Sequence, residues 1–422
     1  MTIFLRILWA VISAIIIMLS FRFTFKLNFV QFKLSKYKRC FSNNSNQNIG
    51  ISPLKTLMLT LAGRIGVGSV AGVALAIYLG GAGTIFWIWV ISILSLPIAY
   101  VETYLGSLYK KKIGSEYVGG PSYYILYGLK NIKLSKIYAF LIFISFIVGF
   151  LGIQVNTIVK STSLIFPVSK LTVGIFLSVL TLFIVIGDVF KISSATSKIV
   201  PFMLLFYLSL SLYILSVNSD KIISMICLII KSAFNLKSFF SSFLYTFIIG
   251  IQRGIFSSEV GLGTGSITAS ASNSNNPSGD GYLQMLGVSI TTLIVCTITA
   301  FMVLLSPYQN MFLNDVNGIE VASFAFSYHF GNLGKILMFI FIFLCSFSTI
   351  LTGYYDSSVS LKFLNFGGNK FQKLFLISIT LIMIIISSLV SSSLMWHLVD
   401  LSTAILILVN LYSLYHLEDN VK

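Results

Sequence analysis

The sequence predicts an all-α membrane protein of about eleven transmembrane helices, two of them discontinuous. Only 9% of its 422 residues are charged and 56% are hydrophobic, whereas soluble proteins carry roughly 25% charged residues. Apolar runs of about 20 residues, the length that crosses a bilayer, recur along the whole chain. We therefore expect a single transmembrane domain over residues 1–422, embedded in a lipid bilayer.

The predicted helices follow one another with short loops between them. They are expected at Phe4–Phe23, Leu54–Tyr78, Thr84–Tyr109, Ile137–Lys160, Leu171–Gly187, Ile199–Val217, Phe239–Ser270, Tyr282–Ser306, Leu333–Phe363, Phe371–Ser391 and Trp396–Leu417. The apolar stretch Lys221–Asn235 is short, so we interpret it as an interfacial or re-entrant piece rather than a twelfth span.

Lysine and arginine are unevenly divided between the two sides of this bundle. The loops on one side hold roughly twice as many positive charges as those on the other, and positively charged loops stay in the cytoplasm. An odd number of spans then predicts that the N-terminus lies outside and the C-terminus in the cytoplasm. We expect a multi-pass protein of the bacterial inner membrane. The net charge of +16 is thereby explained without nucleic-acid binding.

Two of the predicted helices are rich in glycine. Ala62–Gly72 reads AGRIGVGSVAG, and Gly250–Ser266 reads GIQRGIFSSEVGLGTGS. Glycine destabilises a helix by about 1 kcal/mol relative to alanine, and non-helical backbone survives at membrane depth only where it is buried or lines a wet cavity. We expect both helices to be discontinuous, so that freed carbonyls can bind a cation and half-helix N-termini a carboxylate. The alternative is that these glycines only permit close helix packing.

Three charged residues, Arg64, Arg253 and Glu259, lie inside these glycine-rich segments. A charge near the bilayer centre costs a few kcal/mol and usually marks function. An arginine there either extends to the cytoplasmic interface or pairs with the glutamate to hold the broken helices together. We predict a structural or gating role for all three.

A late helix carries hydroxyl groups about one turn apart, at Ser348, Thr349 and Thr352. Their oxygens suit a hard monovalent cation if they face the first broken helix, although serine and threonine often bond only to their own helix. Gln154 and Asn156 are amides in an apolar helix, placed either to bind substrate or to tie helices together. Asp400 and Asn410 are expected to be helix-end or packing groups.

Other classes of function lack their motifs. Three histidines and four scattered cysteines give no metal-ligand spacing. The sequence contains no nucleotide-binding loop, histidine–acid constellation or nucleophile motif, so we expect neither an enzyme, nor an ATP-driven pump, nor a bound cofactor. The two discontinuous helices therefore favour a secondary transporter, and the alternative is an ion channel or a transport-dead amino-acid sensor with the same fold.

Three long motifs resemble the alanine/glycine:cation symporter family, which belongs to the amino acid–polyamine–cation superfamily. They are GRIGVGSVAGVALAIYLGGAGTIFWIWV (Gly63–Val90), GGPSYYILYGL (Gly119–Leu129) and RGIFSSEVGLGTGS (Arg253–Ser266). The resemblance implies an inverted-repeat fold of the leucine-transporter type. It also implies uptake of alanine, glycine or a close relative, driven by Na⁺ or H⁺.

The resemblance also implies a binding site. One wall would be formed by Gly66, Gly68, Ser69 and Gly72, and the other by Phe256, Ser257 and Ser258, with Gln154 beside them. Na⁺ would be bound by Ser348 and Thr349 together with backbone carbonyls of the Gly66–Gly72 segment.

The chain departs from the family pattern at several of these positions. Asparagine is usual in the family where Ser69 and Ser258 stand, and a bulkier residue is usual at Gly353, which predicts a larger pocket. The identity of the amino acid and of the coupling cation therefore stays open.

Overall fold

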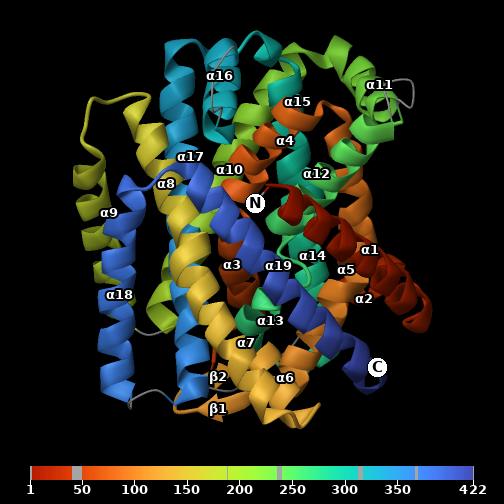
Figure 1. The fold of residues 1–422 in the computed structure, drawn as a ribbon, viewed down its shortest axis with the longest axis vertical. Coiled ribbons are helices and arrows are strands. Elements are labelled where there is room, and N and C mark those ends of the chain that lie inside the picture. Colours follow the sequence, from red (N-terminus) through yellow and green to blue (C-terminus); the bar gives the residue numbers. More distant parts are fainter. Residues whose placement is uncertain are drawn as a thin grey trace.

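The computed structural model describes residues 2–39, 50–187, 189–234, 240–311, 317–365 and 369–421, and nearly all of them are helical (Figure 1). In chain order, the helices and strands are α1 (Thr2–Lys26), α2 (Leu34–Arg39), α3 (Pro53–Arg64), α4 (Val73–Gly80), α5 (Gly83–Leu108), β1 (Lys111–Ile113), β2 (Glu116–Val118), α6 (Pro121–Tyr127), α7 (Ile132–Ile144), α8 (Leu151–Ser163), α9 (Lys170–Val185), α10 (Val189–Val217), α11 (Ile222–Ala233), α12 (Phe240–Ser258), α13 (Thr264–Ser270), α14 (Pro277–Ser289), α15 (Cys296–Leu304), α16 (Gly318–Phe330), α17 (Asn332–Leu364), α18 (Asn369–Leu389) and α19 (Ser392–Leu417).

Eight helices in the described part of the chain are long and apolar enough to cross a membrane, and a bent pair raises the number to nine. Each coincides with a predicted span. The two remaining predicted spans are the 16-residue helix α9 and the α12–α13 pair. The all-α membrane class is confirmed, and the count of eleven stays a prediction.

The first predicted break is confirmed between α3 and α4. Helix α3 ends at Arg64, Ile65 leaves the helical region at φ −85°, ψ 77°, and a wide π-helical turn, Gly68–Gly72, leads into α4. The two halves are bent by 50°. All residues from Thr60 to Ala74 are buried, so this non-helical backbone is enclosed by protein, as its depth requires.

The second break separates α12 from α13. Glu259, Gly261 and Gly263 all have left-handed backbone, with φ of 55°, 83° and 82°. Glycine adopts this conformation freely, whereas glutamate does so at a cost. Gly250, earlier in this segment, allows α12 to pack closely against α5. A Cβ at this position would lie only 2.6 Å from the Cβ of Trp87. The expected break and the alternative of close packing thus both apply, to different glycines.

The broken helices cross at mid-height of the bundle. Helices α4 and α12 lie in the upper half of Figure 1, and α3 and α13 lie in the lower half. The π-helical turn contacts α12, α13 contacts α3, and α17 runs beside α3. The β-hairpin and the C-terminus mark the lower end.

Helix α16 and the β-hairpin lie where only loops were expected. Helix α16 begins with a capping box between Asn317 and Glu320 and packs against α4 and α17. Strands β1 and β2 form an antiparallel hairpin in which Lys111 pairs with Val118. The apolar stretch predicted to be too short for a span is the 12-residue helix α11.

Candidate functional site

The candidate site is built around the first helix break. The amide N–H of Val67 donates to Oε1 of Gln154, at 3.2 Å. A Cβ on Gly66 would lie 2.6 Å from Oγ1 of Thr349 and 3.1 Å from Nε2 of Gln154. The absence of a side chain at Gly66 therefore lets α8 and α17 both reach the unwound backbone.

The hydroxyl groups of α17 face the last turn of α3. Thr349 donates to the carbonyl oxygen of Ala62 at 2.9 Å, and Ser348 approaches the same oxygen at 3.3 Å. Both also lie within bonding distance of the carbonyl of Cys345 in their own helix. The prediction that these hydroxyls face the first broken helix is confirmed, but the carbonyls that they reach belong to Ala62 and Gly63 and not to the predicted Gly66–Gly72 segment.

Aromatic rings enclose the other side of the first break. A Cβ on Gly68 would lie 2.8 Å from the ring of Phe256. That ring is 4% exposed and lies between Phe150, at a centroid distance of 5.5 Å, and Trp396, at 5.6 Å. The two predicted walls of the site, one from each broken helix, therefore touch at Gly68 and Phe256. The ring of Trp396 lies close to the first wall as well, 3.6 Å from the position of a Cβ on Gly72.

The hydroxyls of the three predicted serines bond to backbone or to a cysteine. Ser69 donates to the carbonyl of Gly66 at 3.0 Å, and Ser258 donates to Ile255 within α12. Ser257 lies 3.1 Å from the sulfur of Cys296. These hydroxyls bond to their own segments or to α15.

The space beside Gly353 is filled. A Cβ at this position would lie 2.9 Å from Cδ1 of Phe146, whose ring stacks on Phe150 at a centroid distance of 4.5 Å. The expectation of a larger pocket at Gly353 is therefore wrong, because an aromatic side chain from the neighbouring helix occupies that volume.

Arg253 pairs with an aspartate rather than with a glutamate. Its two terminal nitrogens each lie 3.1 Å from an oxygen of Asp400 on α19, and its guanidinium lies 4.4 Å from the ring centroid of Trp396. The expectation that Asp400 is only a packing or helix-end group is wrong. The pair joins α12 to α19 beside the ring of Trp396.

Arg64 is 2% exposed and so does not extend to an interface. Its Nη1 donates to the backbone oxygen and to Oε1 of Gln284, at 3.1 and 3.0 Å. A Cβ on Gly265 would lie 2.5 Å from Nη2, so the guanidinium lies between α14 and α13. Glu259 accepts a bond from the hydroxyl of Thr264, the first residue of α13, at 2.8 Å.

Glu102, a residue not singled out from the sequence, holds the second break in place. This fully buried residue accepts the amide N–H of Gly261 at 3.1 Å. Asn410 donates to Glu102 and to the carbonyl of Gly261, at 3.2 and 2.9 Å, and accepts from Tyr124. A glutamate within the apolar run of α5 was the signal that could have identified it.

A cavity of about 700 Å³ opens above the site, at the end of the bundle where α4 and α16 lie. Asn156, Lys160, Arg253, Asn317, Trp396 and Asp400 are among its lining residues. Trp396 lines this cavity and packs against Phe256 and Gly72 at the first break. We call it the upper cavity.

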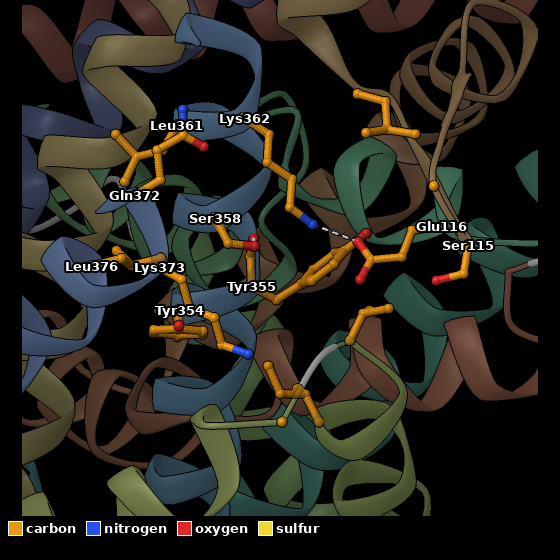
Figure 2. Close-up of a pocket in the computed structure, with 15 residues that line it drawn as sticks. Ser115, Glu116, Tyr354, Tyr355, Ser358, Leu361, Lys362, Gln372, Lys373 and Leu376 are labelled. Carbon is orange, nitrogen blue, oxygen red and sulfur yellow. Dashed lines mark hydrogen bonds and ion pairs between the residues drawn. The ribbon is translucent and has the colours of Figure 1, made fainter. Parts of the chain in front are cut away.

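A second cavity, of about 300 Å³, lies at the lower end between the β-hairpin and helices α10, α17 and α18. Figure 2 shows Lys362 of α17 paired across it with Glu116 of β2, at 2.6 Å. We call it the lower cavity. The two cavities open at opposite ends, with the candidate site between them.

The whole chain, residues 1–422, matches the sodium:alanine symporter family. It is 32% identical to the amino-acid carrier protein AlsT of Bacillus subtilis, over 96% of this chain and 86% of the relative. It is also 32% identical to the sodium/alanine symporter AgcS of Methanococcus maripaludis, over 93% and 88%, and to the probable sodium/glutamine symporter GlnT of Bacillus subtilis, over 96% and 85%. The family is one of membrane transporters and not of enzymes. With its apolar helices, its two broken helices and this match over its full length, the chain belongs to the sodium:alanine symporter family.

Proposed function

We propose that this protein couples the inward movement of Na⁺ to uptake of alanine, glycine or a closely related amino acid across a bacterial inner membrane. The observation that carries the proposal is the convergence of the Ser348 and Thr349 hydroxyls on the carbonyl of Ala62, immediately before the first helix break. Membership of the family supports coupling to Na⁺.

We propose that Na⁺ binds between α17 and the end of α3. Both hydroxyls turn a lone pair toward the ion when it binds, and carbonyl oxygens of Ala62 and Gly63 complete part of its shell, since discontinuous helices coordinate Na⁺ through freed carbonyls. Thr349 already lies within 3.3 Å of the Gly63 carbonyl. An ion here would fix the angle between α17 and the broken helix, and so couple cation binding to the conformation of the substrate site.

We propose that the amino acid binds beside the same break. The first N–H groups of the π-helical turn and the α4 half-helix carry partial positive charge, which favours a carboxylate. Gln154 supplies an amide next to Gly66, and the ring of Phe256 limits the length of the side chain. A substrate with a small side chain fits this arrangement of glycine backbone and aromatic ring.

The remaining features of the proposal concern topology. We propose eleven spans in an inverted repeat of the leucine-transporter type, with the upper cavity facing outside and the lower cavity facing the cytoplasm. The excess of lysine and arginine in the lower loops supports this orientation. Transport then requires the Phe256–Trp396 contact and the Glu116–Lys362 pair to open in alternation.

Uptake into proteoliposomes tests the proposal. Purified protein is reconstituted with K⁺ inside, and uptake of radiolabelled alanine, glycine and glutamine is measured with external Na⁺ or external choline. The K⁺ gradient is the same in both arms, so valinomycin sets the same membrane potential. We expect accumulation only with the inward Na⁺ gradient. A proton gradient imposed without Na⁺ identifies H⁺ coupling instead.

Protein-free liposomes provide the background for this measurement. If none of the three amino acids accumulates under either gradient, the proposed function is wrong. Thermal stabilisation by alanine in Na⁺ but not in K⁺, without any uptake, would indicate a sensor, because a ligand that binds only the folded state raises its stability whether or not it is transported.

A further inference from the structure

Asp356 is a buried acid that the proposed transport site does not use. It lies in α17 and is 1% exposed, and neither of its carboxyl oxygens has a hydrogen-bond partner among the described residues. Buried polar groups are otherwise almost always bonded. An acid inside a membrane-spanning helix is also costly and usually marks an ion or proton pathway.

Asp356 continues the hydroxyl stripe of α17 toward the lower end. Thr349, Thr352 and Asp356 are spaced by three and four residues, so they share one face of the helix. Thr349 donates to Ala62, and Thr352 donates to Leu59 at 3.2 Å. The stripe thus leads from the proposed Na⁺ site down along α3, and Asp356 is the next polar group on it.

The charged and titratable groups around Asp356 are mostly acidic or neutral. Glu259, at the second break, is an acid whose charge acts on Asp356. The charge of Asp356 acts in turn on Tyr138 of α7, whose hydroxyl donates to the carbonyl of Leu262. Tyr355 is the neighbour of Asp356 on α17. Arg64, from α3, acts on Glu259 and donates to Gln284, so none of these groups supplies a cation to Asp356.

The protonation state of Asp356 follows from this setting. An ionised carboxylate that is buried without a hydrogen bond or a cation is strongly unfavourable, and a second acid nearby makes it more so. The neutral carboxylic acid is tolerated far better. Loss of the proton would therefore favour any conformation in which water reaches this face of α17.

The lower cavity offers such a route. Its wall includes Tyr355 and Ser358 of α17 and Gln372 of α18. The ring of Tyr355 points toward Glu116 (Figure 2), and its buried hydroxyl has no partner among the described residues. Tyr355 and Ser358 lie on the face of α17 that is turned away from Asp356, so the cavity joins the stripe that contains Asp356 only when α17 also rotates about its own axis.

We propose that Asp356 is a proton-binding site that gates the cytoplasmic pathway. With the proton bound, the lower half stays closed around a neutral acid. Release of the proton to the cytoplasm leaves a carboxylate that draws water in from the lower cavity and opens the route from the Na⁺ site. The proposal rests on the proposed function for the orientation of the cavity and for what passes through it.

Thiol labelling tests the gate without any transport. Gln372 lines the lower cavity and is 6% exposed, so Gln372→Cys, with Cys40 and Cys227 replaced by serine, reports its opening. Maleimide labelling is measured from pH 6 to pH 9 without Na⁺ or amino acid. The labelling rate of this variant is divided by the labelling rate of a second variant that also carries Asp356→Asn. The pH dependence of the thiol itself is the same in both proteins, so the ratio reports only the opening that depends on Asp356.

We expect this ratio to rise with pH, by at most about tenfold per pH unit, as Asp356 ionises. Asp356→Glu should retain the rise, since it retains the acid. Ser357→Ala, which removes the neighbouring buried hydroxyl, should label like the parent. A ratio that does not change with pH overturns the proposal, whether or not the protein transports alanine.

Uptake with a varied internal pH provides the second readout. At constant external pH and Na⁺ gradient, the initial rate in wild-type proteoliposomes should increase as internal pH increases, whereas Asp356→Asn should show no such dependence. If Asp356→Asn does not fold, the comparison is made between Asp356→Glu and the wild type, whose profiles should be displaced along the pH axis. Identical profiles for all folded variants would refute the gate, and loss of uptake by the wild type itself would instead count against the proposed function.

Discussion

Thr349 donates its hydroxyl to the carbonyl oxygen of Ala62 at 2.9 Å, which joins α17 to the last turn of α3 before the first break. This bond places a side-chain oxygen and a backbone oxygen from two separate helices next to each other. A cation bound there would sense any change in the distance between those helices.

Thr349→Val tests this site because it removes the hydroxyl and keeps the shape of the side chain. Loss of one oxygen ligand should raise the Na⁺ concentration for half-maximal alanine uptake by about tenfold, equivalent to roughly 1.4 kcal/mol. The measurement is uptake against Na⁺ concentration at saturating alanine. Ser346→Ala is the matched control, because its buried hydroxyl on the same helix has no partner among the described residues, and an equal effect there would contradict the assignment.

The two helix breaks could be predicted from the sequence because their cause is local. Glycine clusters such as Gly66–Gly72 combine with charged residues in otherwise apolar runs, and both features are visible without tertiary contacts. The backbone of Gly261 and Gly263 has the positive φ that only glycine adopts at little cost. The alignment of Ser348 and Thr349 with the first break could likewise be expected from helical spacing.

The pairing of the buried charges could not be predicted in the same way. Arg253 and Asp400 are 147 residues apart in the chain, and only the packing of α12 on α19 makes them neighbours. Helix α16 was missed for a different reason: it is short, and its first turn begins with the polar residues Asn317 and Glu320, which resemble a loop. Its position is set by contacts with α4 and α17.

Glycine at position 66 should be required, and glycine at position 72 should not. In Gly66→Ala the new Cβ would lie 2.6 Å from Oγ1 of Thr349, whereas in Gly72→Ala it would meet nothing closer than the ring of Trp396 at 3.6 Å, an ordinary contact. We expect Gly66→Ala to abolish Na⁺-driven uptake and Gly72→Ala to retain most of it. Both variants are compared at equal amounts of folded protein in proteoliposomes, and equal activity would show that crowding at the first break does not limit transport.

Removal of either partner of the Arg253–Asp400 pair should destabilise the fold strongly, since both side chains are about 10% exposed and the remaining charge would be buried without a partner. Asp400→Asn leaves a buried guanidinium without its counter-charge, which should cost about 3 kcal/mol. Arg253→Gln should cost a similar amount, and the double variant less than their sum. These proteins form a double-mutant cycle, and thermal unfolding in detergent gives the stability of the wild type, of each single variant and of the double variant.

The exposed pair between Lys26 and Asp419 is the control for this cycle. Asp419→Asn should leave the unfolding temperature nearly unchanged, because solvent screens surface ion pairs. Additive effects of Arg253→Gln and Asp400→Asn would contradict the coupling that the geometry implies.

Gly353 and Phe146 should behave as a size-matched pair. Gly353→Ala places a Cβ 2.9 Å from the ring of Phe146, and that ring is held by stacking on Phe150, which in turn contacts Phe256. The displacement should therefore pass through three rings to the proposed substrate site and raise the KM for alanine by about tenfold, since overpacking a filled core costs roughly 1–3 kcal/mol. Phe146→Leu on top of Gly353→Ala restores the missing volume and should recover most of the affinity, although Phe146→Leu alone should weaken it. The measurement is the KM for alanine uptake of the three variants. If the double variant has a KM as high as that of Gly353→Ala, the glycine is required for its backbone and not for the space that Phe146 occupies.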